Sequence, residues 1–161
     1  MDKKIIYLEP TVISYLTART TSDPIKLAQQ LASKEWWNNH RHKCDIFISN
    51  VVLDEIREGD PAAAQMRMAL AQTLSLLQSN AETDRLSAAL IALHAIPDNH
   101  KEDADHIAIA SIYPIEYLVT WNQKHILNVS MRDRILSIIS DKGYTPPRLV
   151  TPAELLAEMD D

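Results

Sequence analysis

Short runs of β-forming residues alternate with longer helix-forming segments along this chain, and this alternation constrains the fold more than any other feature. Because helix-forming segments separate the strand-like runs, neighbouring strands are expected to run parallel rather than to pair as hairpins. The order predicts an α/β fold, in which a central parallel sheet of four or five strands is covered by helices on both faces. The strand-like runs lie at residues 4–8, 45–49, 74–77, 117–120 and 148–150.

Helix-start residues and apolar periodicity place the helices between these runs. Ser22-Asp23-Pro24 begins a long helix that is expected to reach about residue 41. Thr151 and Glu154 form the pattern of a capping box at the start of the last helix. Glu9-Pro10, in contrast, is interpreted as a turn that ends the first strand. Further helices are expected to run from about residue 50 to 57, to begin at 61, and to span 82–95, 102–112 and 131–141.

The long helix over residues 24–41 is expected to turn an apolar face toward the core. Ile25, Leu27 and Leu31 are expected on that face, together with one of the two adjacent tryptophans, Trp36 or Trp37. We interpret this tryptophan pair as core or dimer-interface residues rather than as a surface on which bases stack.

The composition is that of one ordinary globular domain, which we expect to span residues 1–161. No apolar stretch approaches the roughly 20 residues needed to cross a bilayer, and the first residues show no apolar signal region. The single cysteine, Cys44, can form no internal disulfide and suits a reducing compartment. We therefore expect a cytoplasmic protein without a membrane partner.

The formal charge of −6 counts mildly against a polyanionic partner, because proteins that bind nucleic acid are usually basic. Arg41, His42 and Lys43 do stand together, either as phosphate contacts or as a solvated helix end. An acidic protein can still bind RNA when its acids surround a metal ion, because the bound cation reverses the local field. The charge therefore leaves a metal-dependent nuclease possible.

Polar residues follow the strand-like runs, where an open parallel sheet binds its ligands. Glu9 comes directly after the first strand, and Asn122 stands two residues after the run 117–120. Asp103 lies in the first turn of its expected helix, where the helix dipole favours a carboxylate. Glu55 shares a helix face with Val51 and Val52, and a carboxylate on a buried face is costly unless it is paired or bound to a metal.

These four side chains form a donor set suited to a hard divalent cation. Three clustered carboxylates repel one another, and Mg²⁺ relieves the repulsion while leaving coordination positions for water and substrate phosphate. The ion would lower the pKa of a water and orient it for attack on phosphorus. Taken singly, each residue also has an ordinary interpretation: Glu9 as a strand end, Glu55 as a solvent-facing acid, Asp103 as a helix-start charge, and Asn122 as a turn residue.

Four segments, in order, carry a resemblance to a known family: YLEPTVISYLTAR, DIFISNVVLDEI, EDADHIAIAS and YLVTWNQKHILN. Together they resemble the PIN-domain family, and more closely its VapC-like branch, over residues 5–152. The resemblance implies a Mg²⁺- or Mn²⁺-dependent endoribonuclease that acts on RNA, the toxin of a type II toxin–antitoxin pair. It also implies a homodimer and a cognate antitoxin that covers the acidic pocket.

The family's four site positions fall on Glu9, Glu55, Asp103 and Asn122, which the resemblance makes the catalytic and metal-binding residues. Placement suggests further residues that would support the site, namely Thr120, His106, Glu102 and His125. The two histidines have an ordinary structural or surface role as the alternative, and Glu102 that of a solvated acid. Asp105, two residues after Asp103, is interpreted as a surface residue.

Two other interpretations of the chain remain open. One is a PIN nuclease that processes RNA without an antitoxin. The other is a non-catalytic PIN-like module that binds RNA or protein. In this second interpretation Glu9, where the family usually has Asp, and Asn122, where it often has a carboxylate, mark a degraded site. RNA cleavage and its metal dependence would separate these alternatives.

Overall fold

A parallel sheet lies at the centre of the computed structural model, which describes residues 2–160. Its strands are ordered β3-β2-β1-β4-β5, and every neighbouring pair runs parallel, as the alternation predicts. The chain passes from β1 to β2 on one side and later to β4 on the other, so the strand order reverses at β1. The strands are β1 (Lys4–Leu8), β2 (Cys44–Ser49), β3 (Ser75–Leu77), β4 (Tyr117–Val119) and β5 (Arg148–Val150).

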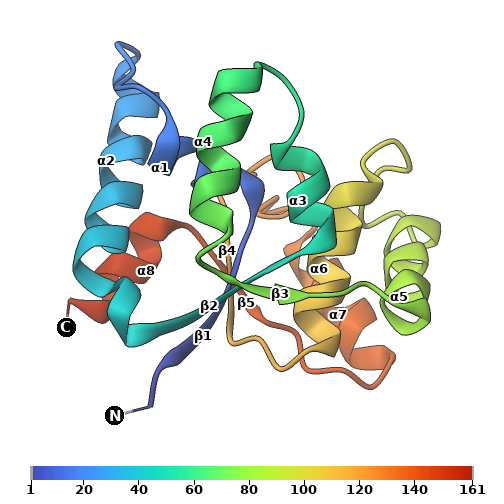
Figure 1. Cartoon of the computed structure of the whole chain (residues 1–161). Coiled ribbons are helices and arrows are strands. Elements are labelled where there is room, and N and C mark those ends of the chain that lie inside the picture. Colours follow the sequence, from blue (N-terminus) through green and yellow to red (C-terminus); the bar gives the residue numbers. More distant parts are fainter. Residues whose placement is uncertain (1, 161) are drawn as a thin grey trace.

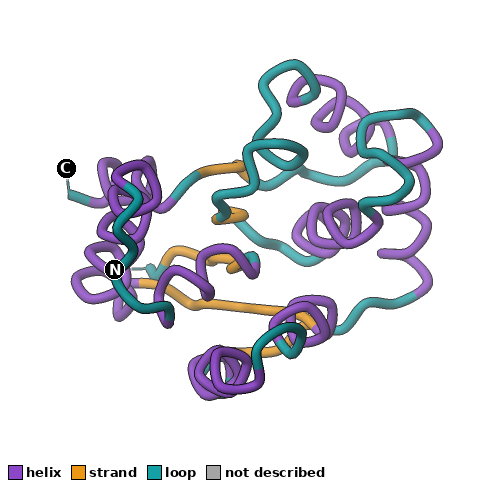
Figure 2. Tube along the Cα trace, turned by 90° about the horizontal axis from the view of Figure 1, so that it is seen from above, coloured by secondary structure: helices purple, strands orange, loops and turns teal. Residues whose placement is uncertain are grey.

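Helices cover both faces of this sheet and complete a three-layer α/β/α arrangement. Figure 1 shows α2 and α8 on one side of the strands and α5, α6 and α7 on the other. The view from above separates the same two groups of helices, with the strands between them (Figure 2). The helices are α1 (Pro10–Thr17), α2 (Pro24–His40), α3 (Asn50–Ile56), α4 (Pro61–Ala71), α5 (Ala81–Ala92), α6 (Lys101–Ile112), α7 (Arg132–Asp141) and α8 (Pro152–Met159), with a 3-10 turn η1 (Arg41–Lys43).

The expected turn at Glu9-Pro10 is wrong, because α1 begins at Pro10. Proline suits the first position of a helix, where its missing N–H has no partner to lose. The side chain of Glu9 caps this helix by accepting a hydrogen bond of 2.8 Å from the Thr11 N–H. The dipeptide therefore starts a helix directly after the strand, and the same glutamate serves as cap and as candidate site residue.

The expected inward face of α2 is also wrong in part. Ile25 and Leu31 are 74% and 56% exposed, whereas Trp36 is fully buried and Trp37 partly buried. Gln30 lies on the buried face instead, and its amide donates hydrogen bonds to the carbonyls of Ala18 and Arg19 at 3.0 and 3.1 Å. These carbonyls follow the end of α1. The buried amide of Gln30 supplies them with hydrogen-bond donors, which an aliphatic side chain at the same position could not do.

The other expected boundaries hold within one to three residues. The largest difference is at α5, which ends at Ala92 rather than at residue 95, because His94 adopts a left-handed φ of 61°. The amides of Ala95 and Ile96 then bond to the carbonyl of Leu90 and close the helix end. The expected capping box of Thr151 and Glu154 is confirmed at the start of α8.

The apolar core lies on both faces of the sheet. Ile6, Tyr7 and Leu8 of β1 are fully buried, as expected for a strand covered by helices on both sides. Ile107 of α6 and Leu118 of β4 belong to the same cluster. Each helix within residues 2–160 is too short or too polar to traverse a lipid bilayer. That residues 1–161 form one independent domain stays a prediction.

Candidate active site

The site is built at the carboxyl edge of the sheet, between β1 and β4. Glu9 follows β1 directly, and its N–H donates to the Val119 carbonyl of β4 at 3.1 Å. The residue as a whole is 2% exposed. Oε1 accepts hydrogen bonds from the Thr11 N–H at 2.8 Å, from the Thr11 hydroxyl, and from the Thr120 hydroxyl at 3.0 Å. These donors hold one carboxylate oxygen and fix its direction.

Burial dominates the electrostatics of Glu9. Removal from water raises the pKa of its carboxyl above the ordinary value, because the charged form loses solvation. The charge of His106 and the hydrogen bonds from Thr11 and Thr120 lower the pKa but do not cancel the effect of burial. A cation beside this carboxylate would favour its charged form, as His106 does in part.

Asp103 and Asn122 are joined directly. The Asn122 amide donates to Asp103 Oδ1 at 2.9 Å, and the Asn122 N–H donates to the Thr120 hydroxyl at 2.8 Å. Since the same hydroxyl donates to Glu9, Thr120 links Glu9 to Asn122 and through it to Asp103. His125 Nδ1 lies 2.8 Å from Asp103 Oδ2, on the other oxygen of that carboxylate.

Glu55 reaches the site from α3 and is held by His106. The Nε2 atom of His106 lies 2.5 Å from Glu55 Oε1, and its Nδ1 lies 2.7 Å from the Tyr7 hydroxyl. That hydroxyl also lies 2.7 Å from the hydroxyl of Ser49, which caps α3. A continuous chain of hydrogen bonds therefore runs from the centre of β1 to the Glu55 carboxylate.

His106 is the electrostatic centre of the acidic group. Its imidazole is fully buried, and burial alone would lower its pKa. The hydrogen bond to Glu55 and the charges of Glu55, Glu9 and Asp103 raise the pKa, and together they outweigh burial. Three carboxylates from three separate segments thus act on one imidazole.

The structure brings these residues together in two hydrogen-bonded groups. In one, Thr120 and Asn122 link Glu9 to Asp103, which His125 also contacts, and in the other His106 holds Glu55. The charge of His106 couples the second group to Glu9 and Asp103. Glu102 is exposed in the first turn of α6, and no hydrogen bond or ion pair within residues 2–160 joins its side chain to either group. The catalytic and metal-binding roles of these residues stay predictions.

Asp105 is not the surface residue that its position suggests. Its side chain is 12% exposed and accepts a hydrogen bond of 2.6 Å from the Ser87 hydroxyl of α5. Lys101 pairs with it at 2.9 Å, one turn earlier on α6. Because α5 packs closely along α6, this face of α6 is covered, and Asp105 fastens the two helices rather than facing water.

Four residues near the site escaped the sequence analysis: Tyr7, Thr11, Ser49 and His100. In the sequence Tyr7 resembles the other apolar residues of a buried strand. Its position in the strand does not indicate which residues its hydroxyl contacts. Thr11 lies two residues after Glu9, directly after the pair Glu9-Pro10 that was interpreted as a turn. His100 stands three residues before Asp103, and this helical spacing was a usable signal.

A pocket of about 520 Å³ adjoins the site on the side of His125 and is also lined by His94, Lys124 and Met131. A larger groove of about 940 Å³ lies away from the acids, between α2 and α4, and is lined by Trp37, Phe47 and Met66 among others. The smaller pocket therefore offers the nearer space for a bound molecule.

The architecture and site define an α/β/α protein with an acidic centre at the topological switch of its sheet. Among sequences, no protein-family model and no curated protein matches the chain. Among solved structures it is similar to VapC20 of Mycobacterium tuberculosis, a sarcin-ricin loop cleaving toxin. The identity is 17% and the TM-score 0.55, over 87% of this chain and 96% of that one.

It is also similar to VapBC2 from Rickettsia felis, solved bound to a DNA fragment from its promoter. Here the identity is 17% and the TM-score 0.50, over 91% of this chain and 98% of the other. The chain therefore has a VapC-like PIN fold, and the resemblance seen in its sequence is confirmed at the level of the fold.

Proposed function

We propose that this protein is a Mg²⁺- or Mn²⁺-dependent endoribonuclease and the toxin of a type II toxin–antitoxin pair. The observation that carries the proposal is the gathering of Glu9, Glu55 and Asp103 around His106 at the carboxyl edge of the sheet. A parallel sheet binds its ligands at this edge. Within residues 2–160 these three carboxylates form ion pairs with histidine only and none with lysine or arginine. Carboxylates collected in this way favour a metal ion.

The donor set fits a hard divalent cation. Glu9, Glu55 and Asp103 offer carboxylate oxygens, and Asn122 offers an amide oxygen, the ligand types that Mg²⁺ and Mn²⁺ prefer. When bound, such an ion supplies the activation of an attacking water and neutralises charge on the phosphate of the RNA backbone.

The protein's own residues position these ligands. Thr11 and Thr120 hold Glu9, the Asn122 amide and His125 hold the two oxygens of Asp103, and His106 holds Glu55. Hydrogen bonds from a second layer of residues orient ligands and commonly change metal affinity by about 10–100-fold. Thr120 and His106 are therefore positioning residues, whose loss would weaken metal binding without removing a ligand.

The partners of the protein follow from the same proposal. RNA is the substrate, and the antitoxin would be a cognate protein that covers the acidic pocket, with a cationic side chain taking the place of the metal charge. The similarity to VapC20, a toxin, and to VapBC2 supports this assignment. We also propose a homodimer that acts in the cytoplasm, where its RNA substrate is found.

Cleavage of RNA under defined metal conditions tests the proposal. Single-stranded RNA is incubated with the protein after chelation, then with added Mg²⁺ or Mn²⁺, and the products are resolved on a denaturing gel. We expect cleavage only with metal, and loss of cleavage in Asp103→Asn. Asp54→Asn is the matched control, because Asp54 is an exposed acid on α3 beside Glu55.

Metal-independent cleavage, or equal cleavage by Asp103→Asn, would refute the mechanism. Absence of cleavage under either metal would favour the non-catalytic module. Expression in bacteria separates the biological roles: growth arrest relieved by a neighbouring gene supports the toxin. Cleavage without growth arrest supports an RNA-processing nuclease.

A further inference from the structure

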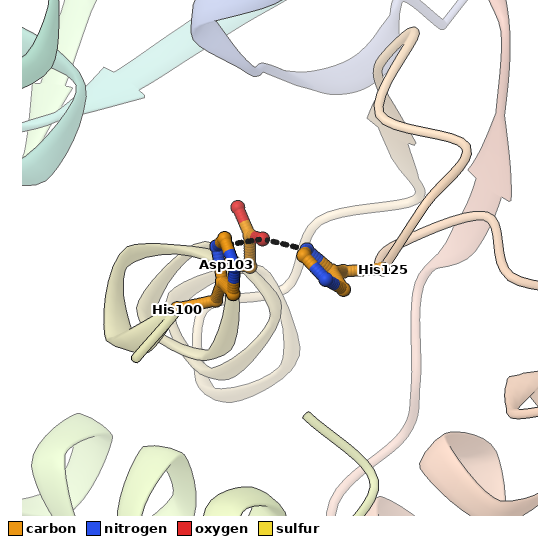
Figure 3. A group of neighbouring side chains, drawn as sticks. All are labelled: His100, Asp103 and His125. Carbon is orange, nitrogen blue, oxygen red and sulfur yellow. Dashed lines mark hydrogen bonds and ion pairs between the residues drawn. The ribbon is translucent and has the colours of Figure 1, made fainter. Parts of the chain in front are cut away.

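Two histidines flank Asp103 and point at the same carboxylate oxygen. His100 lies at the N-terminal boundary of α6 and Asp103 in its first turn, while His125 comes from the segment between β4 and α7. Figure 3 shows the Asp103 carboxylate between the two imidazoles. His125 Nδ1 lies 2.8 Å from Asp103 Oδ2, and His100 Nδ1 lies 3.9 Å from that atom.

The three groups form a compact ligand set. One ligand atom from each residue lies within 4.8 Å of the other two, and the imidazole centroids are 4.0 Å apart. In a tetrahedral zinc site, bonds of 2.0–2.1 Å place neighbouring ligand atoms about 3.3 Å apart. The distance from His125 Nδ1 to Asp103 Oδ2, 2.8 Å, is shorter than this value, and the distance from His100 Nδ1 to the same oxygen, 3.9 Å, is longer. Small side-chain rotations would therefore bring the three atoms to one ion.

We propose that His100, Asp103 and His125 bind a divalent transition-metal ion of the zinc and cobalt type. Imidazole nitrogens favour these ions, whereas Mg²⁺ prefers oxygen ligands and keeps several waters. Two imidazoles and one carboxylate leave an open coordination position for water or a substrate oxygen. The site is thus chemically distinct from the oxygen donor set of Glu9, Glu55 and Asn122, although it uses Asp103 as well.

The residues around this ligand set hold it in place. The Asn122 amide donates to Asp103 Oδ1 at 2.9 Å, which directs Oδ2 toward the histidines. The amide oxygen of the same Asn122 accepts the His125 N–H at 3.1 Å and fixes the backbone that carries His125. One asparagine therefore orients two of the three ligands, as residues behind a metal site commonly do.

Burial and access also suit an ion. The side chains of Asp103 and His125 are nearly buried, while that of His100 is 40% exposed. The pocket of about 520 Å³ lined by His125 and Lys124 adjoins the cluster and provides a path from solvent. An ion that reaches the cluster from this pocket would be held by the two buried ligands, and the partly exposed His100 would complete the set.

The proposal is independent of RNA cleavage, because binding of the ion can be measured with the metal alone. The full chain is stripped of metal and titrated with Co²⁺, whose visible absorption is intense in four-coordinate sites and weak in six-coordinate ones. We expect an intense band that saturates at one Co²⁺ per chain. Zn²⁺ should abolish the band, and a large excess of Mg²⁺ should not.

Variants assign the band to these residues. His100→Ala should weaken Co²⁺ binding about tenfold or more, and its partly exposed position makes it the variant least prone to misfold. His125→Ala should act in the same direction. His42→Ala is the matched control, because His42 is an exposed histidine on η1 outside the cluster, and it should bind Co²⁺ as the wild type does.

A weak six-coordinate spectrum, displacement of Co²⁺ by Mg²⁺, or equal binding by His100→Ala and the wild type would overturn the proposal. These results are distinct from a failure of the nuclease assignment. Mg²⁺-dependent RNA cleavage without the cobalt band would leave the nuclease intact. The cobalt band without RNA cleavage would leave the histidine site intact.

Discussion

Thr120 connects Glu9 to Asn122 and through it to Asp103, so its replacement by valine tests this hydrogen-bonded group directly. Valine keeps the shape of threonine but removes the hydroxyl. That hydroxyl is buried, donates to Glu9 Oε1 at 3.0 Å, and accepts from the Asn122 N–H at 2.8 Å. Thr120→Val therefore removes one donor from a buried carboxylate and one acceptor from a partly buried amide.

The magnitude follows from these two losses. A hydrogen bond to a charged group contributes about 1.5–3 kcal/mol, and a buried N–H left without a partner costs about 1–3 kcal/mol. Because the amide of Asn122 is only partly buried, the lower end applies to it. We expect Thr120→Val to lower the free energy of unfolding by about 2.5–4 kcal/mol at neutral pH.

The loss of stability in Thr120→Val should depend on pH, because the hydroxyl acts on the charged form of Glu9. The Thr120 hydroxyl lowers the pKa of Glu9, so it stabilises the charged carboxylate. Its contribution is present above the pKa of Glu9 and is lost as the pH falls through it. Burial, in contrast, holds that pKa above its unfolded value, so ionisation of Glu9 costs stability as the pH rises. The difference between Thr120→Val and wild type should therefore shrink in acid.

Urea unfolding of the metal-free protein, followed by circular dichroism at several pH values, measures this difference. Thr145→Val is the control, because Thr145 is exposed and lies outside the acidic network. A loss below about 0.5 kcal/mol would lie within the range of ordinary surface substitutions. That result, or a loss that stays constant from neutral pH into acid, would show that the Thr120 hydroxyl does not stabilise the charged carboxylate of Glu9.

Three further predictions test the buried groups around the site and core. Burial raises the pKa of the Cys44 thiol to about 11, so at pH 8 only about one thiol in a thousand is the reactive thiolate. A thiol reagent should modify the native protein far more slowly than the urea-unfolded chain, and equal rates would contradict this. Tyr7→Phe removes the hydroxyl beside His106 and should lower the free energy of unfolding by about 1–2 kcal/mol in urea titrations. An unchanged midpoint would show that this hydrogen bond contributes nothing. Asp105→Ala should lower the thermal midpoint because it breaks the contacts between α5 and α6, whereas Asp54→Ala, at an exposed position, should not. Equal thermal midpoints for the two variants would instead support the interpretation of Asp105 as a solvent-facing surface residue.

The sequence was most informative for features that local residue patterns and the order of the segments determine. Apolar runs and helix caps predicted a parallel sheet between helices, and the structure has that sheet. In a parallel sheet all carboxyl ends lie at one edge. The position of Glu9 after β1 and of Asn122 after β4 therefore predicted that these residues lie near one another.

Local pattern failed where a residue has two plausible environments. The pair Glu9-Pro10 is compatible with the end of a strand and with the start of a helix. The hydrogen bond from the Thr11 N–H to the Glu9 carboxylate shows that a helix begins there, directly after the strand ends. On α2, hydrophobicity favoured Ile25 and Leu31 as inward residues, but the end of α1 required the amide of Gln30. Propensity describes a helix in isolation, and the neighbouring segment decides which face is buried.

The layers of the fold and the edge of the sheet that carries the acids could both be predicted from the sequence. Only the tertiary structure decided which atoms meet: His106 with Glu55 and Tyr7, and Asp103 with His125. These contacts depend on the order β3-β2-β1-β4-β5 and on the packing of α6 against β1, where His106 meets Tyr7. The periodicity of a sequence indicates which face of its own helix or strand a residue occupies. A contact between distant side chains depends instead on packing, to which the whole chain contributes.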